Sequence, residues 1–350
     1  MMVPFRITYA WETSDCPGRI TFATEPAADL AAAVIQAVRP VLPVEGAQLR
    51  ALSPAAAAGT AIGGYALTGP EGRWFLRVTS HIGTPALEKA LVDGLQAAGV
   101  PVNPILAAGI PLVWHGHELR LDIRPLVQAR HFDGSDGDLV ALGRAMAAAH
   151  RALADTVVAP SVHRLAATRN DRLLGHRDRL AGMMCEPGEF PRLGFPPGWA
   201  ERNRDWLRRW CAEYRPDWHQ QPGAQCLHGE IHQGNVLYDG AGTAMLVDFE
   251  ESTDVFAPPV WDLAYAVQRF CLFDQPEREV FLVRLGHLTA GYGKPIDGLG
   301  DGMRQIAYHC MATLLDLFIE RGLSSPESEF DKFVQLEGRA ARLVRDAFLS

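Results

Sequence analysis

Residues 227–251 read LHGEIHQGNVLYDGAGTAMLVDFEE, and this stretch decides the fold that we expect. Glu230 stands five residues before Asn235, and Asp248 follows Asn235 by thirteen residues. Between them, two short apolar runs separated by the turn signal DGAG predict a β-hairpin. A hairpin holds its ends side by side, so Asn235 and Asp248 can both face one divalent cation while Glu230 reaches an incoming hydroxyl. This layout of carboxylate, amide and carboxylate is typical of a kinase catalytic centre.

The same segment resembles the aminoglycoside phosphotransferase and choline kinase family, small-molecule kinases that share the protein-kinase-like fold. The catalytic loop of that family reads His-Gly-Asp-x-x-x-x-Asn, and its metal-binding Asp opens a short motif after a hairpin. The matching positions are His228, Gly229, Glu230, Asn235, Asp248, Phe249 and Glu250. The family also places an Asp on a helix just downstream, which Asp262 matches. The chain departs from the family pattern at Glu230, where the family usually has Asp.

The resemblance implies an α+β chain with the bilobal protein-kinase-like fold, in which a small β-rich N-terminal lobe precedes a larger, mainly helical C-terminal lobe. The sequence pattern agrees with this order. After a helical run at 27–40, β-type runs and one helical run follow at 48–52, 61–67, 74–79, 85–98, 105–108 and 119–124. Helical patterns then fill 139–153, 164–184, 199–214, 261–273, 278–292, 301–321 and 327–349. We therefore predict an N-terminal lobe at residues 1–124, with an extra N-terminal segment, and a C-terminal lobe at 125–350.

Four residues of the predicted N-terminal lobe are candidates for nucleotide binding. Arg77 lies on the third predicted strand, where the family places a basic residue, and Glu88 in the next helix can pair with it. The alternative for these two is a solvated surface pair. Gly63 and Gly64 stand between the first two strands, where a loop over the phosphates belongs, although an ordinary hairpin turn fits equally well. The chain has no Gly-x-x-x-x-Gly-Lys-Ser/Thr sequence, which disfavours a P-loop fold.

The catalytic side is assigned from the resemblance and from the chemistry of the side chains. Glu230 is the predicted catalytic carboxylate, which accepts the proton of the acceptor hydroxyl. Asn235 belongs to the same catalytic set, and with Asp248 it is predicted to hold Mg²⁺, which prefers hard oxygen ligands. We expect His228 to orient the loop and Asp262 to fix its shape, or Asp262 to be a simple acid at a helix N-terminus. Glu is one methylene longer than Asp, and a misplacement of about 1 Å can cost about a hundredfold in rate.

Acidic residues after the metal motif suggest the chemistry of the acceptor. Glu250, Glu251 and Asp254 would surround an acceptor pocket with negative charge, which favours a cationic acceptor. Trp261 can supply an aromatic wall for an ammonium group. The alternatives are a solvated acidic face and, for Trp261, packing in the core.

The composition limits the classes of protein that fit. A length of 350 residues suggests about two domains, and a net charge of −8 argues against nucleic acid as a partner. The six cysteines are scattered without metal-site spacing, which indicates reduced thiols. No signal-peptide pattern and no run of eighteen apolar residues is present. We therefore expect a cytoplasmic protein, monomeric or homodimeric, with a small-molecule acceptor and no membrane partner.

The combined prediction is a kinase that uses ATP or GTP with Mg²⁺ and phosphorylates a hydroxyl of a small acceptor. Aminoglycoside-like antibiotics, amino sugars and amino alcohols are the acceptors that the acidic residues favour. A second hypothesis is a nucleotide-binding pseudokinase or regulatory module in which Glu230 no longer supports transfer. A third is a zinc hydrolase, because His228 and His232 flank Glu230, but nearby glycines indicate a loop rather than the helix of a His-Glu-x-x-His site.

Overall fold

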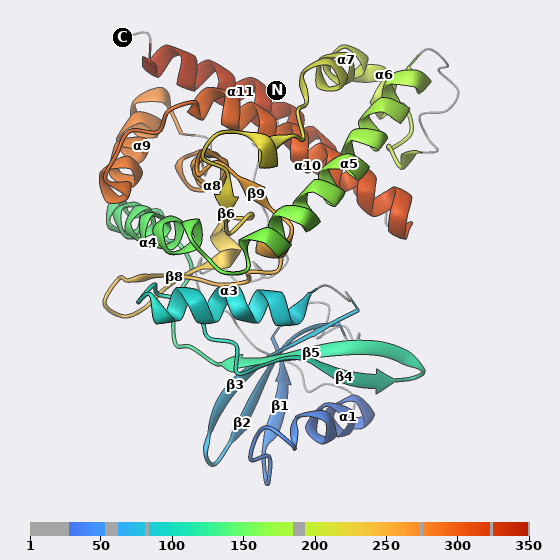
Figure 1. Ribbon diagram of the computed structural model, residues 1–350, viewed down its shortest axis with the longest axis vertical. Helices are drawn as coiled ribbons and strands as arrows, with labels where there is room; N and C mark the ends of the chain where they lie inside the picture. Colours follow the sequence, from blue (N-terminus) through green and yellow to red (C-terminus); the bar gives the residue numbers. More distant parts are fainter. Residues whose placement is uncertain are drawn as a thin grey trace.

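A five-stranded antiparallel sheet forms the smaller of two lobes (Figure 1). The computed structural model describes residues 28–52, 62–80, 84–184, 193–272, 276–322 and 325–348. The strand order is β1-β2-β3-β5-β4, with β1 at Gln48–Ala51, β2 at Gly63–Gly69, β3 at Gly72–Thr79, β4 at Ala107–Trp114 and β5 at His117–Pro125. Helices α1 (Ala28–Val38) and α3 (Pro85–Ala97) belong to the same lobe. The predicted N-terminal segment, residues 1–27, lies outside the described residues.

The two faces of this sheet carry different side chains, because residues alternate along a strand. On β3, Trp74, Leu76 and Val78 are buried and share a core cluster with the buried side of α1. Phe75 and Arg77 therefore point to the opposite face. Helix α3 lies on that face, between the sheet and the larger lobe (Figure 1). The sheet thus presents Arg77 toward the space between the lobes.

The larger lobe is mainly helical, in agreement with the predicted pattern. Its helices are α4 (Asp136–Ala154), α5 (Ala159–Met183), α6 (Trp199–Arg202), α7 (Arg204–Glu213), α8 (Val260–Ala266), α9 (Arg278–Tyr292), α10 (Leu299–Arg321) and α11 (Glu327–Phe348). The run predicted as one helix at 261–273 begins as α8 but continues as a π-helical turn, Val267–Cys271. Such turns occur often beside functional sites. The run ends before residues 273–275, which lie outside the described residues.

Helices α4 and α9 approach each other closely because glycines stand at their crossing. A Cβ atom on Gly143 would lie 2.3 Å from the carbonyl oxygen of Leu288, and one on Gly291 would lie 2.1 Å from that of Val140. Any larger residue would force the two backbones apart. The crossing fixes α4, whose C-terminal half carries His150 toward the site described below.

The predicted β-hairpin is present, with β7 at Val236–Tyr238 and β8 at Ala244–Leu246. The backbone N–H of Val247 donates to the carbonyl oxygen of Asn235 at 3.0 Å, which joins the two ends of the hairpin. Tyr238 and Arg130 exchange two backbone hydrogen bonds, of 2.9 and 2.7 Å, so the hairpin is also tied to the connection between the lobes. Strand β6 (Gln225–Cys226) precedes the hairpin in the sequence and β9 (Phe256–Ala257) follows it. These two strands pair with each other.

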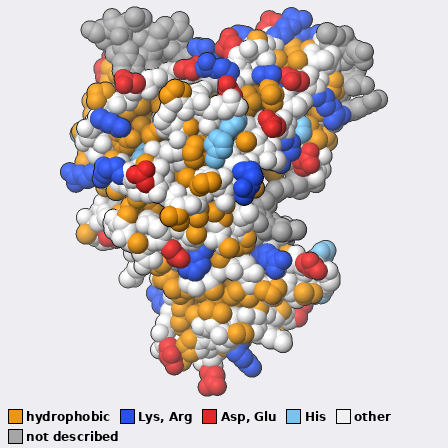
Figure 2. Space-filling model, viewed as in Figure 1, with side chains coloured by type: hydrophobic (Ala, Val, Ile, Leu, Met, Phe, Trp, Pro, Cys, Tyr) orange, Lys and Arg blue, Asp and Glu red, His pale blue; other side chains and the backbone are white. Residues whose placement is uncertain are grey.

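The predicted α+β, bilobal architecture is confirmed. Strand β5 ends at Pro125, beside the predicted division between residues 124 and 125. The free cysteines are Cys211, Cys226, Cys271 and Cys310, whereas Cys16 and Cys185 lie outside the described residues. On the face seen in Figure 2, basic and acidic side chains are interspersed. Within the described ranges, no helix combines the length and apolarity needed to cross a membrane.

Candidate active site

The backbone of the loop before the hairpin is held by Asp262, near the start of α8. Its carboxylate accepts hydrogen bonds from the backbone N–H groups of His228 and Gly229, both at 2.9 Å. His150 lies 3.2 Å from the same carboxylate. Burial alone would raise the pKa of Asp262, but the contact with His150 and these backbone donors lower it overall. Asp262 is therefore an ionised anchor of the loop, fully enclosed by protein.

His228 connects the same loop to the end of the hairpin. Its Nε2 lies 2.9 Å from the carbonyl oxygen of Val247, and its Nδ1 accepts from the backbone N–H of Glu230 at 3.3 Å. Burial lowers the pKa of His228, so the ring is neutral at pH 7 and fits one donor and one acceptor nitrogen. The ring also packs against Phe249, with centroids 4.5 Å apart. His228 thus orients Glu230 relative to the metal motif without reaching the surface.

Asn235 and Asp248 lie side by side because the hairpin ends are joined by a backbone hydrogen bond. The side-chain nitrogen of Asn235 donates to the carbonyl oxygen of Glu230 at 3.0 Å and lies 3.5 Å from its carboxylate. This leaves the amide oxygen of Asn235 for a cation. Asp248 has a φ of 65°, a left-handed conformation that Asp tolerates better than most residues. The hard oxygen atoms of these two side chains fit Mg²⁺.

Arg77 reaches across the space between the lobes to the metal motif. Its guanidinium forms ion pairs with Asp248 and with Glu250. The expected pairing of Arg77 with Glu88 is wrong, because Glu88 pairs instead with Arg124 at 2.5 Å. The reason is geometric: the planar fork of Arg77 spans two carboxylates of the larger lobe, and Arg124 on β5 lies beneath α3.

Glu230 lies among other acids. Burial and then the charges of Glu251, Asp248 and Glu250 together raise the pKa of Glu230 to about 8. His232 does not offset them, since burial lowers its own pKa to about 3 and leaves the ring neutral. The carboxyl group is not sealed off, because the side chain of Glu230 is 35% exposed. It is therefore a proton acceptor whose pKa lies close to neutral pH.

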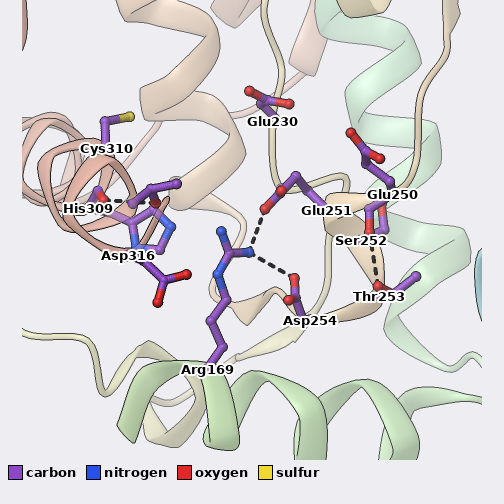
Figure 3. Close-up of polar contacts among 12 residues, drawn as sticks. Arg169, Glu230, Glu250, Glu251, Ser252, Thr253, Asp254, His309, Cys310 and Asp316 are labelled. Atoms are coloured by element: carbon purple, nitrogen blue, oxygen red, sulfur yellow. Dashed lines mark hydrogen bonds and ion pairs between the residues drawn. The ribbon is translucent and has the colours of Figure 1, made fainter. Parts of the chain in front are cut away.

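Arg169 of α5 compensates the acids that follow the metal motif. Its guanidinium lies 2.5 Å from the carboxylate of Glu251 and 2.8 Å from that of Asp254 (Figure 3). Asp316 of α10 is paired in the same way, with Arg172 at 2.7 Å and with a histidine. The negative charge of Glu251 and Asp254, which the sequence suggested for an acceptor pocket, is therefore paired with Arg169. Glu250 is likewise held by an arginine of the other lobe.

Trp261 lies in the core rather than along a pocket. Its ring is 3% exposed and meets Trp218 and His309 edge to face, with centroids 5.3 and 4.7 Å apart. Its indole N–H lies 3.4 Å from the carbonyl oxygen of Gly229. The expectation of an aromatic wall for the acceptor is thus wrong for Trp261. Its indole contacts the backbone of the catalytic loop at Gly229 instead.

A cavity of about 720 Å³ lies between the sheet and the hairpin. Gly63, Gly64, Phe75 and Arg77 line it from the smaller lobe, and Asp248 and residues 125–129 complete its walls. A Cβ atom on Gly64 would lie 2.9 Å from the ring of Phe75, so a side chain there would displace the ring. Gly64 therefore keeps this wall open. Residues 53–61, which precede both glycines, lie outside the described residues.

The histidines of the loop do not converge as zinc ligands. His228 faces Val247, and Nδ1 of His232 accepts from the backbone N–H of Gly234 at 3.0 Å. Among the described residues, the group of three that could hold a metal is His176, Asp316 and Glu320, away from this loop. The zinc hypothesis therefore has no geometric support at Glu230.

A model of the phosphotransferase enzyme family, APH, matches residues 56–295. The chain belongs to this phosphotransferase family. In fold it resembles a microcompartment-associated aminopropanol kinase, with a TM-score of 0.54 and 17% identity over 90% of this chain and 97% of that one. It also resembles an aminoglycoside-3'-phosphotransferase of type VIII, with a TM-score of 0.52 and 18% identity over 87% and 99% of the two chains. No curated protein matches the sequence.

Membership of the phosphotransferase family makes the chain an enzyme that transfers phosphoryl groups to hydroxyls. Two arginines of its site, Arg124 and Arg169, were not singled out in the sequence. Arg124 is the last residue of the predicted strand before the lobe boundary. A charged residue at that position was a signal that could have identified it. Arg169 offered no local signal, since it lies 82 residues before Glu251.

Proposed function

We propose that this phosphotransferase moves the γ-phosphoryl group of ATP or GTP, bound with Mg²⁺, to a hydroxyl of a small acceptor. The observation that carries the proposal is the meeting of Glu230, Asn235 and Asp248 at the joined ends of the hairpin. Asp248 also lines the cavity between the lobes, which is large enough for a nucleotide. A proton acceptor, two cation ligands and a nucleotide-sized cavity at one place are the parts that phosphoryl transfer requires.

In the proposed reaction, the acceptor hydroxyl attacks the γ-phosphorus of the nucleotide. The bond between the γ-phosphorus and the β,γ-bridging oxygen breaks, and the nucleoside diphosphate leaves. Glu230 orients the hydroxyl and takes its proton as the new P–O bond forms. Asn235 and Asp248 would hold Mg²⁺, which would neutralise charge on the transferred group. Arg77 exchanges its carboxylate partners for phosphate oxygens, which suit its planar fork equally well. Asp262 and His228 hold the loop in place throughout.

The acceptors that we favour carry both a hydroxyl and an amine, as amino alcohols and amino sugars do. Glu230 supports this, because the neighbouring acids raise its pKa and an ammonium group would relieve that repulsion. The pairing of Glu251 and Asp254 with Arg169 limits the number of ammonium groups that the site can bind. A singly charged amino alcohol therefore fits better than a highly charged antibiotic.

Steady-state phosphotransfer tests the proposal. The protein would be given ATP or GTP with Mg²⁺ and matched pairs of acceptors, an amino alcohol against its neutral diol and an amino sugar against its neutral sugar. We expect transfer to the amino compounds and none with Asp248→Ala. Absence of transfer to every acceptor, together with binding of nucleotide, would refute the enzyme mechanism.

A pseudokinase is the second candidate, and the longer side chain at position 230 favours it. If the extra methylene misplaces the carboxylate, Glu230→Asp should create or strongly raise activity. If Glu230 is already well placed, the same substitution should lower activity. The sign of this one change separates the two candidates.

A further inference from the structure

The ion pairs of Arg77 place a positive charge at the cation site itself. Its guanidinium contacts the carboxylate of Asp248, one of the two proposed Mg²⁺ ligands, and also the carboxylate of Glu250. The side chain of Arg77 is 21% exposed, so solvent screens its charge only in part. A divalent cation that approached Asp248 would therefore meet a guanidinium on the same carboxylate, and the two positive charges would repel each other.

Two acids of the smaller lobe lie near Arg77, and both already have partners. Asp122 pairs with Arg77 in the register of β3 and β5, and Glu88 lines a small cavity together with both residues. Glu88 is held by Arg124 at 2.5 Å, and the carboxylate of Asp122 accepts from the backbone N–H of Gly109 at 2.7 Å. The guanidinium of Arg77 is instead directed toward the larger lobe, where it spans two carboxylates of the metal motif.

Phosphate oxygens would change the partners of Arg77. Arg77 and Asp248 line the cavity that we assign to the nucleotide. A guanidinium binds phosphate in the same bidentate way as carboxylate, so a nucleotide offers Arg77 a replacement for both acids. The carboxylate of Asp248 then becomes available to a cation. We infer that Arg77 keeps Mg²⁺ from Asp248 until a nucleotide phosphate has drawn the guanidinium away, an inference that rests on the proposed function.

This arrangement couples the binding of cation and nucleotide. Each ligand favours the state in which Arg77 has left Asp248, so each makes the binding of the other easier, and the coupling is reciprocal. The protein without nucleotide should therefore bind divalent cations weakly. Nucleotide should raise the cation affinity by more than its own phosphate oxygens contribute.

Binding of Mn²⁺, a paramagnetic substitute for Mg²⁺, tests the inference without turnover, because the resonance of the free ion is lost when it binds. Without nucleotide, Arg77→Met should bind Mn²⁺ about tenfold more tightly than the natural protein, the scale expected for two partly exposed ion pairs. Arg73→Met is the matched control. Arg73 is exposed and lies on the same face of β3, about 13 Å along the strand, so its removal should leave the affinity unchanged.

Two further measurements locate the ion and test the coupling. Adding Asp248→Asn to Arg77→Met should abolish the gain in Mn²⁺ affinity, which places the ion at this carboxylate. ADP should raise the Mn²⁺ affinity by a larger factor in the natural protein than in Arg77→Met. Formation of the Mn²⁺–ADP complex in solution is the same for both proteins and cancels from this comparison.

Arg77→Lys decides the matter if Arg77→Met fails to fold. Lysine keeps the charge but lacks the fork that spans two carboxylates, so it should raise the nucleotide-free Mn²⁺ affinity by about twofold or more. Equal affinity in the natural protein and in the folded variants of position 77, lost with Asp248→Asn, would overturn the inference and leave the proposed function standing. Mn²⁺ binding that is unaffected by Asp248→Asn, with or without ADP, would overturn both.

Discussion

Two arginines hold the acidic segment that follows the hairpin, and they approach it from different lobes. Arg77 on β3 of the smaller lobe pairs with Asp248 and Glu250. Arg169 on α5 of the larger lobe pairs with Glu251 and Asp254. The first contact joins the lobes at the cation site, whereas the second lies wholly within one lobe.

The two arginine pairs should therefore have different roles, one functional and one structural, although their four acids lie within seven consecutive residues, 248–254. An ion pair between lobes can exchange its partners when nucleotide and cation enter between them. An ion pair within a lobe stays intact and fixes the backbone on which the metal ligands stand. Acids that look equivalent in the sequence should therefore respond differently when they or their arginines are replaced.

The largest expected effect is that of removing the metal ligand. Asp248→Asn should lower kcat by about a thousandfold or more, equivalent to about 4 kcal/mol of transition-state stabilisation, because the transferred group loses its cation. Asp254→Asn is the matched control in the Arg169 pair and should retain most activity. Turnover with the best acceptor measures both. Similar losses in the two variants would remove the distinction between the arginine pairs.

The next effect is that of Arg77→Met, which keeps the apolar stem but removes the charge. We expect kcat/KM to fall by about a hundredfold, since a group that would hold phosphate oxygens is lost. Stability should change by less than about 1 kcal/mol, because the carboxylates that Arg77 contacts are each about a third exposed. Turnover and urea unfolding on the same preparation would show whether the two quantities separate. A large loss of stability with normal turnover would contradict a role at the phosphates.

Arg169→Met should have the opposite effect to Arg77→Met, a larger loss of stability and a smaller loss of turnover. Arg169 is itself buried, and its removal leaves Glu251 and Asp254 facing each other without compensation. We expect the free energy of unfolding to fall by about 1–3 kcal/mol, with a smaller loss of turnover than in Arg77→Met. Urea unfolding measures the first quantity and saturation kinetics the second. Equal stability to the natural protein would mean that solvent already screens these two acids.

The sequence predicted the elements of the site better than their partners. The hairpin and the strands could be predicted because alternation and turn signals are local, and the fold followed from their order. The pairing of Glu88 could not, since either Arg77 or Arg124 can reach a helix that lies over adjacent strands. Arg169 meets its acids only through the packing of α5, which no spacing encodes. The burial of Trp261 could not be predicted either, because it depends on residues distant in the sequence that pack around its ring.

The smallest expected effect concerns pH and follows from the raised pKa of Glu230. The unfolded carboxyl titrates near 4.5 and the folded one near 8, so between these values the folded state keeps a proton that the unfolded chain releases. Raising the pH through this window therefore favours unfolding. Glu230→Gln should remove this contribution and gain thermal stability relative to the natural protein as the pH rises from 5.5 to 8.5.

Turnover should move in the opposite direction to stability, because the reaction needs the ionised form of Glu230. With a pKa of about 8, the ionised fraction rises about tenfold between pH 7 and pH 9, and kcat/KM should follow it. Asp254→Asn again serves as the control, since its profile should keep the same midpoint. A flat profile across this range would mean that Glu230 is ionised at neutral pH, and that Arg77 and the cation compensate the neighbouring acids more fully than the free protein suggests.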